Sequence, residues 1–378
     1  MAPRRDVVSL VVLACVFLVD CVILWTWGRR WGFYDSDWLV YFHAAERLRD
    51  GRPVYAVAGD FLNPPTFLLL VRALLIFGYL PSRLIWSALS IVLLLASGAC
   101  VAAAVGWKPT PATRVWGTLF MLLFVPTMLL IPTSCNSTAP VVFAYALALL
   151  LMVRGREGWA GVTLSLALLI KPQLVFLSLP LLLYKRRWRA LGAYLLTGVG
   201  LTALSFILVG RETFAGFLAM QNTTAKGAGA TDLWIRDIPG LHAAFLQFWP
   251  NSALASLSAY AVSLGLLGWL AYYWRGPWQP SSTGFAARWS ATILVDLLVV
   301  PYAHSDDLVL LLIPAVVFCR YAMQPESAAR AARQWIRPML FAFYLGPVLV
   351  VYYRQHFMAP ILLAGCWLLW KLAPPEGA

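Results

Sequence analysis

The sequence predicts an all-α integral membrane protein, a polytopic bundle of about 10 to 13 transmembrane helices. Hydrophobic residues make up 61% of the 378-residue chain and charged residues only 12%, and the mean hydropathy is +0.75. This composition is too apolar for an ordinary water-soluble globule. The net charge of +13 comes mainly from arginines in short loops beside apolar segments, where basic residues set orientation. Nucleic-acid binding is therefore not expected.

The first apolar segment, residues 7–27, follows Arg4 and Arg5. It is long enough to cross a hydrocarbon core of about 30 Å and is followed by no small-residue cleavage site. We predict a retained anchor helix.

Three basic stretches fix the predicted orientation: residues 154–157, 185–189 and 320–337. Positively charged loops favour the cytoplasm, so we place all three there and residues 210–252 in an external loop. The predicted crossings in this half of the chain are residues 190–209, 253–273, 285–303, 308–320, 338–352 and 357–372.

Between the first two basic stretches, Lys171-Pro172 interrupts an apolar run. Proline lacks a backbone donor and disfavours helical geometry before it, so we expect two short helices that meet on the outer side. Residues 64–153 offer four apolar stretches where an odd number of crossings is needed. One stretch is therefore re-entrant or interfacial, and the sequence leaves open which one.

The first external loop, residues 28–63, is crowded with acids, arginines and aromatics. From Asp37 onward its apolar positions follow helical spacing and Gly51 is suited to the stop, which predicts an amphipathic helix on the membrane surface. Asp37 has the position of an N-cap. The apolar positions are Trp38, Tyr41, Phe42, Ala45 and Leu48.

Four stretches in this order resemble glycosyltransferase family 87, the polyprenol-phosphate-mannose-dependent mannosyltransferase relatives with a GT-C fold. They are DWLVYFHAAERLRDGRPVY, FLNPPTFLLLV, GVTLSLALLIKPQLVFLSLPLLLYKRRWRA and VPYAHSDDLVLLLIPA. The resemblance implies one GT-C-like domain over residues 1–378 that moves a sugar, commonly mannose, from a polyprenyl-phosphate donor to an acceptor hydroxyl. It also implies a catalytic base at Asp37, with Asp35 as the second choice.

The resemblance further implies a multi-pass protein of the prokaryotic plasma membrane, acting in the cell envelope with its site on the extracytoplasmic side. The expected partners are the lipid bilayer, the lipid-linked sugar, and a glycolipid, glycan or protein acceptor. We expect neither a cofactor nor a metal.

The chemistry of this transfer explains the aspartate. A sugar on a lipid phosphate carries a good leaving group, so the enzyme needs a base for the acceptor hydroxyl and a cation for the departing phosphate. Asp37 as a plain helix cap is the structural alternative. In an extended segment Asp35 and Asp37 share a face, so a metal site or a hydrolase dyad also stays open.

Lys171 is the candidate phosphate ligand, because a lysine near the bilayer core is costly and is functional by default. A snorkelling helix end is its structural alternative. Gln173 and Asn136, the latter in the polar break PTSCNSTAP, are candidate substrate contacts that can equally satisfy helix ends.

His304, Asp306 and Asp307 fall at the predicted outer boundary, on the same side as Asp37 and Lys171. His304 is a candidate for binding substrate or orienting the base, and the two aspartates for substrate binding or for capping the next helix. Tyr41, in the surface helix, is a further candidate substrate contact.

Ionisable residues inside apolar runs suggest a second class of function. Asp20 and Arg72 lie at matching depth and are predicted to pair, and Asp296 lies below His304. Buried ions of this kind are also typical of a transporter of a lipid-linked or small polar substrate. The absence of repeated halves counts against that alternative, and a scaffold without chemistry leaves the outer cluster unexplained.

Overall fold

The computed structural model describes residues 37–55, 61–108, 110–128, 134–225, 238–249, 253–300, 303–323, 330–353 and 358–375. This described part is almost entirely helical and contains no strand, which confirms the all-α prediction. The anchor segment 7–27, Asp20 and Asp35 lie outside the described residues. The principal helices are α2 (Asp37–Arg49), α3 (Pro65–Leu74), α4 (Tyr79–Ala104), α5 (Pro111–Leu123), α7 (Thr138–Val153), α8 (Glu157–Leu168), α9 (Ser178–Tyr184), α10 (Trp188–Val209), α11 (Arg211–Ala225), α13 (Leu241–Phe248), α14 (Ala253–Tyr273), α15 (Thr283–Val299), α16 (Leu312–Ala322), α18 (Ile336–Tyr353) and α19 (Met358–Leu372).

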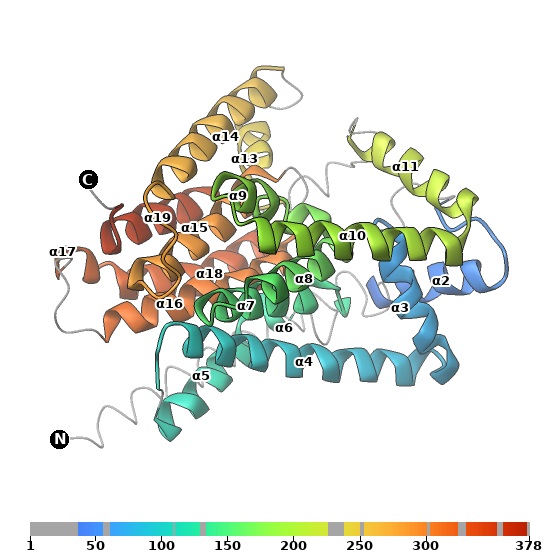
Figure 1. Cartoon of the computed structure of the whole chain (residues 1–378), viewed down its shortest axis with the longest axis horizontal. Helices are drawn as coiled ribbons and strands as arrows, with labels where there is room; N and C mark the ends of the chain where they lie inside the picture. Colours follow the sequence, from blue (N-terminus) through green and yellow to red (C-terminus); the bar gives the residue numbers. More distant parts are fainter. Residues whose placement is uncertain are drawn as a thin grey trace.

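Four helices form a continuous layer in the order α4, α7, α8, α10. Figure 1 shows the long helices α4 and α10 on either side of α7 and α8, and extensive contacts join each neighbouring pair. Helices α2 and α3 pack together near the C-terminal end of α10. Two candidate residues lie near the ends of helices in this layer: Asn136 precedes α7, and Lys171 follows α8.

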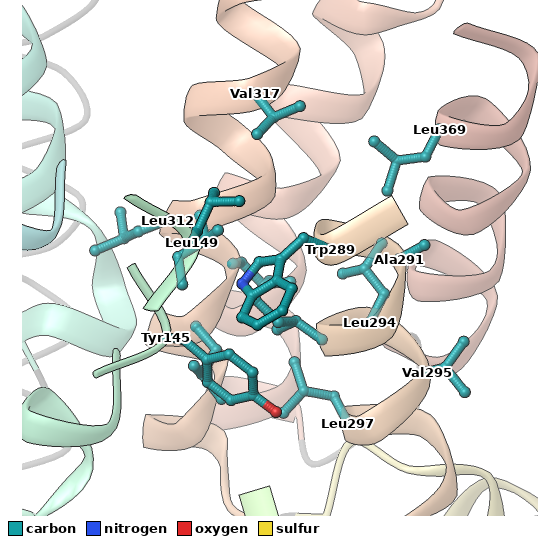
Figure 2. Close-up of a cluster of buried hydrophobic side chains, with 14 of the residues drawn as sticks. Tyr145, Leu149, Trp289, Ala291, Leu294, Val295, Leu297, Leu312, Val317 and Leu369 are labelled. Carbon is teal, nitrogen blue, oxygen red and sulfur yellow. The ribbon is translucent and has the colours of Figure 1, made fainter. Parts of the chain in front are cut away.

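Helix α15 lies in the hydrophobic core. Its residues from Phe285 to Leu298 are buried, and it packs against α14, α16 and α19. Figure 2 shows Trp289 of α15 beside Tyr145 of α7, among leucines of α7, α15, α16 and α19. The centroids of the two rings are 6.0 Å apart. Dispersion and burial of these large side chains hold α7 against α15 and its neighbours α16 and α19.

Three helices are long and apolar enough to cross a membrane: α4, α10 and α14. Their outward faces expose large apolar side chains that a water-soluble protein would bury, including Leu196, Ile207 and Leu264. Such faces suit contact with lipid hydrocarbon. The structure therefore confirms a polytopic membrane protein.

The helices after residue 188 follow the six predicted crossings closely, from α10 to α19. The predicted external loop 210–252 contains α11 and α13. Between the basic stretches, α8 and α9 are two short helices joined through Lys171 and the 3-10 turn η3 (Pro172–Leu174), as the proline predicted.

Helix α3 bears on the question of which of the four apolar stretches between residues 64 and 153 does not cross the membrane. It has 10 residues, so it is about 15 Å long and too short to cross a core of about 30 Å. It packs against α2 and is followed by a 3-10 turn. It is the shortest of α3, α4, α5 and α7, which makes it a candidate for the stretch that does not cross, and Arg72 in its last turn is exposed.

The predicted helix in the first external loop is present as α2. Its apolar face packs against α3 and α4: Trp38 is buried, stacks on Trp86 at 5.4 Å and donates to Ser82 Oγ at 3.2 Å. The helix ends at Arg49 and the chain turns at Gly51, where φ is +68° and the Arg52 amide donates to the Arg47 carbonyl, an arrangement that favours glycine. Placement on the membrane surface, the GT-C assignment and the single-domain boundaries stay predictions.

Candidate active site

Four segments far apart in the sequence meet beside the first turn of α2. They are Asp37 itself, the polar break before α7, the turn after α8, and the 3-10 helix η4 (Ser305–Leu311) between α15 and α16. The polar break begins its turn at Cys135, whose φ of 52° lies in the left-handed region. Trp86 of α4 donates to the Asn136 carbonyl at 3.2 Å and so anchors this turn to the bundle.

Asn136 connects Asp37 to the rest of the site. Its Nδ2 donates to Asp37 Oδ2, and its Oδ1 lies 2.8 Å from the Thr138 hydroxyl. Asp37 is half-buried whereas Asn136 is buried. A buried amide therefore fixes the orientation of a half-buried carboxylate.

Asp307 is the hub of the site. It is fully buried, and its Oδ1 accepts from Lys171 Nζ at 2.7 Å and lies 2.6 Å from the Thr138 hydroxyl. Lys171 Nζ also donates to Thr138 Oγ1 at 2.9 Å. Because a hydroxyl carries one hydrogen, Thr138 donates to either Asp307 or Asn136 while it accepts from the lysine. When Thr138 donates to Asn136, a continuous chain of hydrogen bonds runs from Asp37 to Lys171.

Asp307 also shapes the backbone at His304. Its Oδ2 accepts from the His304 amide at 2.9 Å, and its own amide donates to the His304 carbonyl at 3.0 Å. This is the capping role that the sequence offered for one of the two aspartates. His304 is half-buried and lies close enough to lower the pKa of Asp37.

The pKa values of the two carboxyl groups shift in opposite directions. Burial raises the pKa of Asp37, although Lys171, His304 and the Asn136 amide pull it down. Burial also raises the pKa of Asp307, but Lys171 and the hydrogen bonds from the His304 segment outweigh it, and the net pKa is lowered. Asp307 therefore keeps its charge as the partner of Lys171, while Asp37 becomes the stronger base.

Asp306 lies beside this pair without sharing its hydrogen bonds. It is 8% exposed, and burial raises its pKa to about 8, against the opposing effect of Lys171. The carboxyl of Asp306 is therefore largely protonated near neutral pH, when it can donate a hydrogen bond.

Tyr41 closes the site from the α2 side. Its hydroxyl lies 3.4 Å from Ser137 Oγ, and its ring meets Phe61 and Phe67 edge-on. At 5% exposure Tyr41 is buried, and burial raises the pKa of its hydroxyl well above the usual value, so the phenol stays protonated. Gln173 is half-buried, and its side chain forms no hydrogen bond with the described residues.

Two residues that join the site's hydrogen bonds were not predicted from the sequence. Thr138 bridges Asn136 and Lys171, and Asn63 donates through Nδ2 to Ser137 Oγ at 2.9 Å and to the Ile170 carbonyl at 3.1 Å. Asn63 lies in an apolar stretch before two prolines, which was a usable signal, because a buried amide needs partners.

Comparison with known families gives a match to the model for glycosyltransferase family 87 over residues 61–301. The match covers more than half of the chain. The chain belongs to this family. The matched range of the glycosyltransferase includes Asn136 and Lys171, whereas Asp37 precedes it and His304 follows it. Neither the curated proteins nor the solved structures give a match.

Membership shows a membrane glycosyltransferase, and it removes the support for the transporter and scaffold alternatives. The described residues contain no group of three or more His, Cys, Asp or Glu side chains placed to hold a metal ion. The absence of a metal from the reaction stays a prediction, as do the roles of the individual site residues.

Proposed function

We propose that this glycosyltransferase moves mannose from a polyprenyl-phosphate donor to an acceptor hydroxyl at the outer face of the cell membrane, with Asp37 as general base. The observation that supports it best is the network from Asp37 through Asn136 and Thr138 to Lys171. It joins an accessible carboxylate of raised pKa to the buried ammonium group of the site.

The proposed reaction is a single displacement. Asp37 takes the proton of the acceptor hydroxyl as its oxygen attacks the anomeric carbon, and the bond from that carbon to the phosphate oxygen breaks. The polyprenyl phosphate leaves with the bonding electrons, and the new glycosidic bond has the inverted configuration. A raised pKa suits this role, because a stronger base takes the proton more readily while it is ionised.

Lys171 is proposed to steady the departing phosphate. An ammonium group has three N–H donors, and the described residues use two of them, for Asp307 and Thr138. One donor remains for a phosphate oxygen. His304, Gln173 and Tyr41 are proposed to position substrates, with His304 and Gln173 the more accessible.

An apolar groove supports a lipid-linked donor. It has a volume of about 740 Å³ and follows α10 from Tyr194 to Ile207, with Leu168 of α8 and Phe214 of α11 in its wall. Leu168 lies three residues before Lys171. An isoprenoid chain in this groove would place its phosphate near the Lys171 turn, in an environment that suits hydrocarbon.

The test is a transfer assay with the purified full chain in lipid vesicles. Radiolabelled polyprenyl-phosphate mannose is supplied with separate glycolipid, glycan and peptide acceptors, and labelled product and released polyprenyl phosphate are measured together. We expect equimolar product and released lipid with one acceptor class. Transfer from a nucleotide sugar but not from the lipid donor would contradict the proposal.

A further inference from the structure

A polar hollow lies at the opposite end of α8 from Lys171. It has a volume of about 640 Å³ and is lined by residues 155–159 and 186–189. Helix α8 has 12 residues, so its two ends are about 18 Å apart. The hollow is therefore separate from the candidate active site, and the proposed reaction does not use it.

The hollow forms where two helices begin side by side. A Cβ at Gly161 of α8 would lie 2.0 Å from the Ala190 carbonyl oxygen of α10, so only glycine allows this approach. The residues before the two helices, Arg156 and Arg187, form no side-chain cap hydrogen bond. Two uncapped helix N-termini thus contribute positive potential to the same wall.

Four arginines add full charges to this wall. Arg187 pairs with Glu157 and lies over the Trp278 ring at 5.5 Å, so its charge is largely committed. Arg156, Arg186 and Arg189 are exposed and form no ion pair within the described part of the chain. The wall is therefore strongly cationic, with three guanidinium groups available to a ligand.

The tryptophans in the wall indicate a lipid rather than a water-soluble anion. Trp159 and Trp188 are 67% and 62% exposed, and Trp188 begins α10, a helix long and apolar enough to cross the membrane. Tryptophan beside arginine at such a helix end is typical of the membrane interface. We propose that this hollow binds the phosphate headgroup of an anionic phospholipid, in the leaflet opposite the candidate active site.

Thermal unfolding of the detergent-purified full chain tests this proposal. We expect dioleoylphosphatidylglycerol to raise the unfolding midpoint in a saturable way, and dioleoylphosphatidylcholine to raise it by less than half as much. Inorganic phosphate should have little effect. Equal effects of the two lipids, or full reproduction of the effect by phosphate alone, would overturn the proposal.

Charge-matched variants locate the effect. The triple variant Arg156→Gln, Arg186→Gln, Arg189→Gln should lose at least half of the increment from phosphatidylglycerol. The control triple Lys108→Gln, Arg211→Gln, Arg337→Gln removes the same charge from exposed positions elsewhere and should retain the increment. Equal increments in the two variants would show that no specific site exists.

A steric variant covers the case in which the triple variant does not fold. A Cβ at Gly158 would meet nothing within 4 Å, so Gly158→Phe fills the hollow without a change of charge. This variant should fold and lose at least half of the increment from phosphatidylglycerol. An unchanged increment in Gly158→Phe would refute the location.

Discussion

Lys171 and Asp307 form an ion pair of 2.7 Å across 136 residues of sequence, with side chains only 6% and 0% exposed. Two charges buried this deeply depend on each other, because loss of either leaves the other without compensation. The pair also fixes both segments: Lys171 ends the turn after α8, and Asp307 holds the backbone at His304. Removing both charges together therefore separates the proposed phosphate role of Lys171 from its role as the partner of Asp307.

Lys171→Met should destabilise the protein by about 3 to 5 kcal/mol, because Asp307 is left buried and unpaired. The double variant Lys171→Met, Asp307→Asn should recover much of that stability. If the ammonium also contacts the donor phosphate, the double variant should still show little transfer. The measurements are thermal unfolding and transfer kinetics at varied donor concentration.

Lys171→Arg is the matched control for charge, since the guanidinium keeps the positive charge with a different geometry. We expect partial turnover in this variant. If the double variant Lys171→Met, Asp307→Asn regained both stability and wild-type dependence on donor concentration, Lys171 would serve only as the ion-pair partner of Asp307.

Asn136→Ala removes the amide that orients Asp37. Hydrogen bonds to charged groups contribute about 1.5 to 3 kcal/mol, so transfer should fall by about 10-fold to 150-fold. Gln334→Ala is the comparison, because Gln334 is exposed and is not part of the candidate site. A loss in Asn136→Ala no larger than the loss in Gln334→Ala would contradict the assigned orientation.

Asp306 should make stability depend on pH. Its pKa rises from 3.8 to about 8 on folding, so between these values the folded chain binds more protons than the unfolded chain. The free energy of unfolding should therefore fall as pH rises through this window. Asp306→Asn should flatten the dependence in thermal unfolding, and an unchanged slope would show that Asp306 titrates normally.

The groove along α10 can be tested with a bulky side chain. Thr202→Trp places an indole in the groove wall and should raise KM for a long-chain donor more than for a short-chain analogue. Leu204→Trp is the control, because Leu204 is exposed on α10 but does not line the groove. If donor chain length changed KM equally in both variants, the groove would not be the binding site of the donor lipid chain.

Hydropathy predicted most of the fold, because the bilayer requires long apolar helices. The orientation indicated by the basic flanks stays a prediction. The break at Lys171-Pro172 was also readable, since proline acts locally. The short length of α3 was not predictable, because its apolar composition gives no sign that it ends after 10 residues and packs on α2.

The site was predicted at the level of charged residues but not of their pairing. The sequence suggested that Asp37, Lys171 and the His304–Asp307 segment share one side. It did not indicate that Asp307 is the buried partner of Lys171, which depends on how η4 and α8 both pack on α7. Thr138 and Asn63 were missed because neutral polar residues are common and acquire roles only through distant contacts.

The most direct test of the central claim is transfer by Asp37→Asn, measured beside a thermal unfolding curve of the same preparation. An amide keeps the shape of the side chain and can still accept from Asn136, but it cannot take the acceptor proton. Transfer should fall by at least about 100-fold while the unfolding midpoint stays close to that of the wild type. Near-normal turnover in a folded Asp37→Asn enzyme would contradict Asp37 as the base, and would transfer that prediction to Asp35.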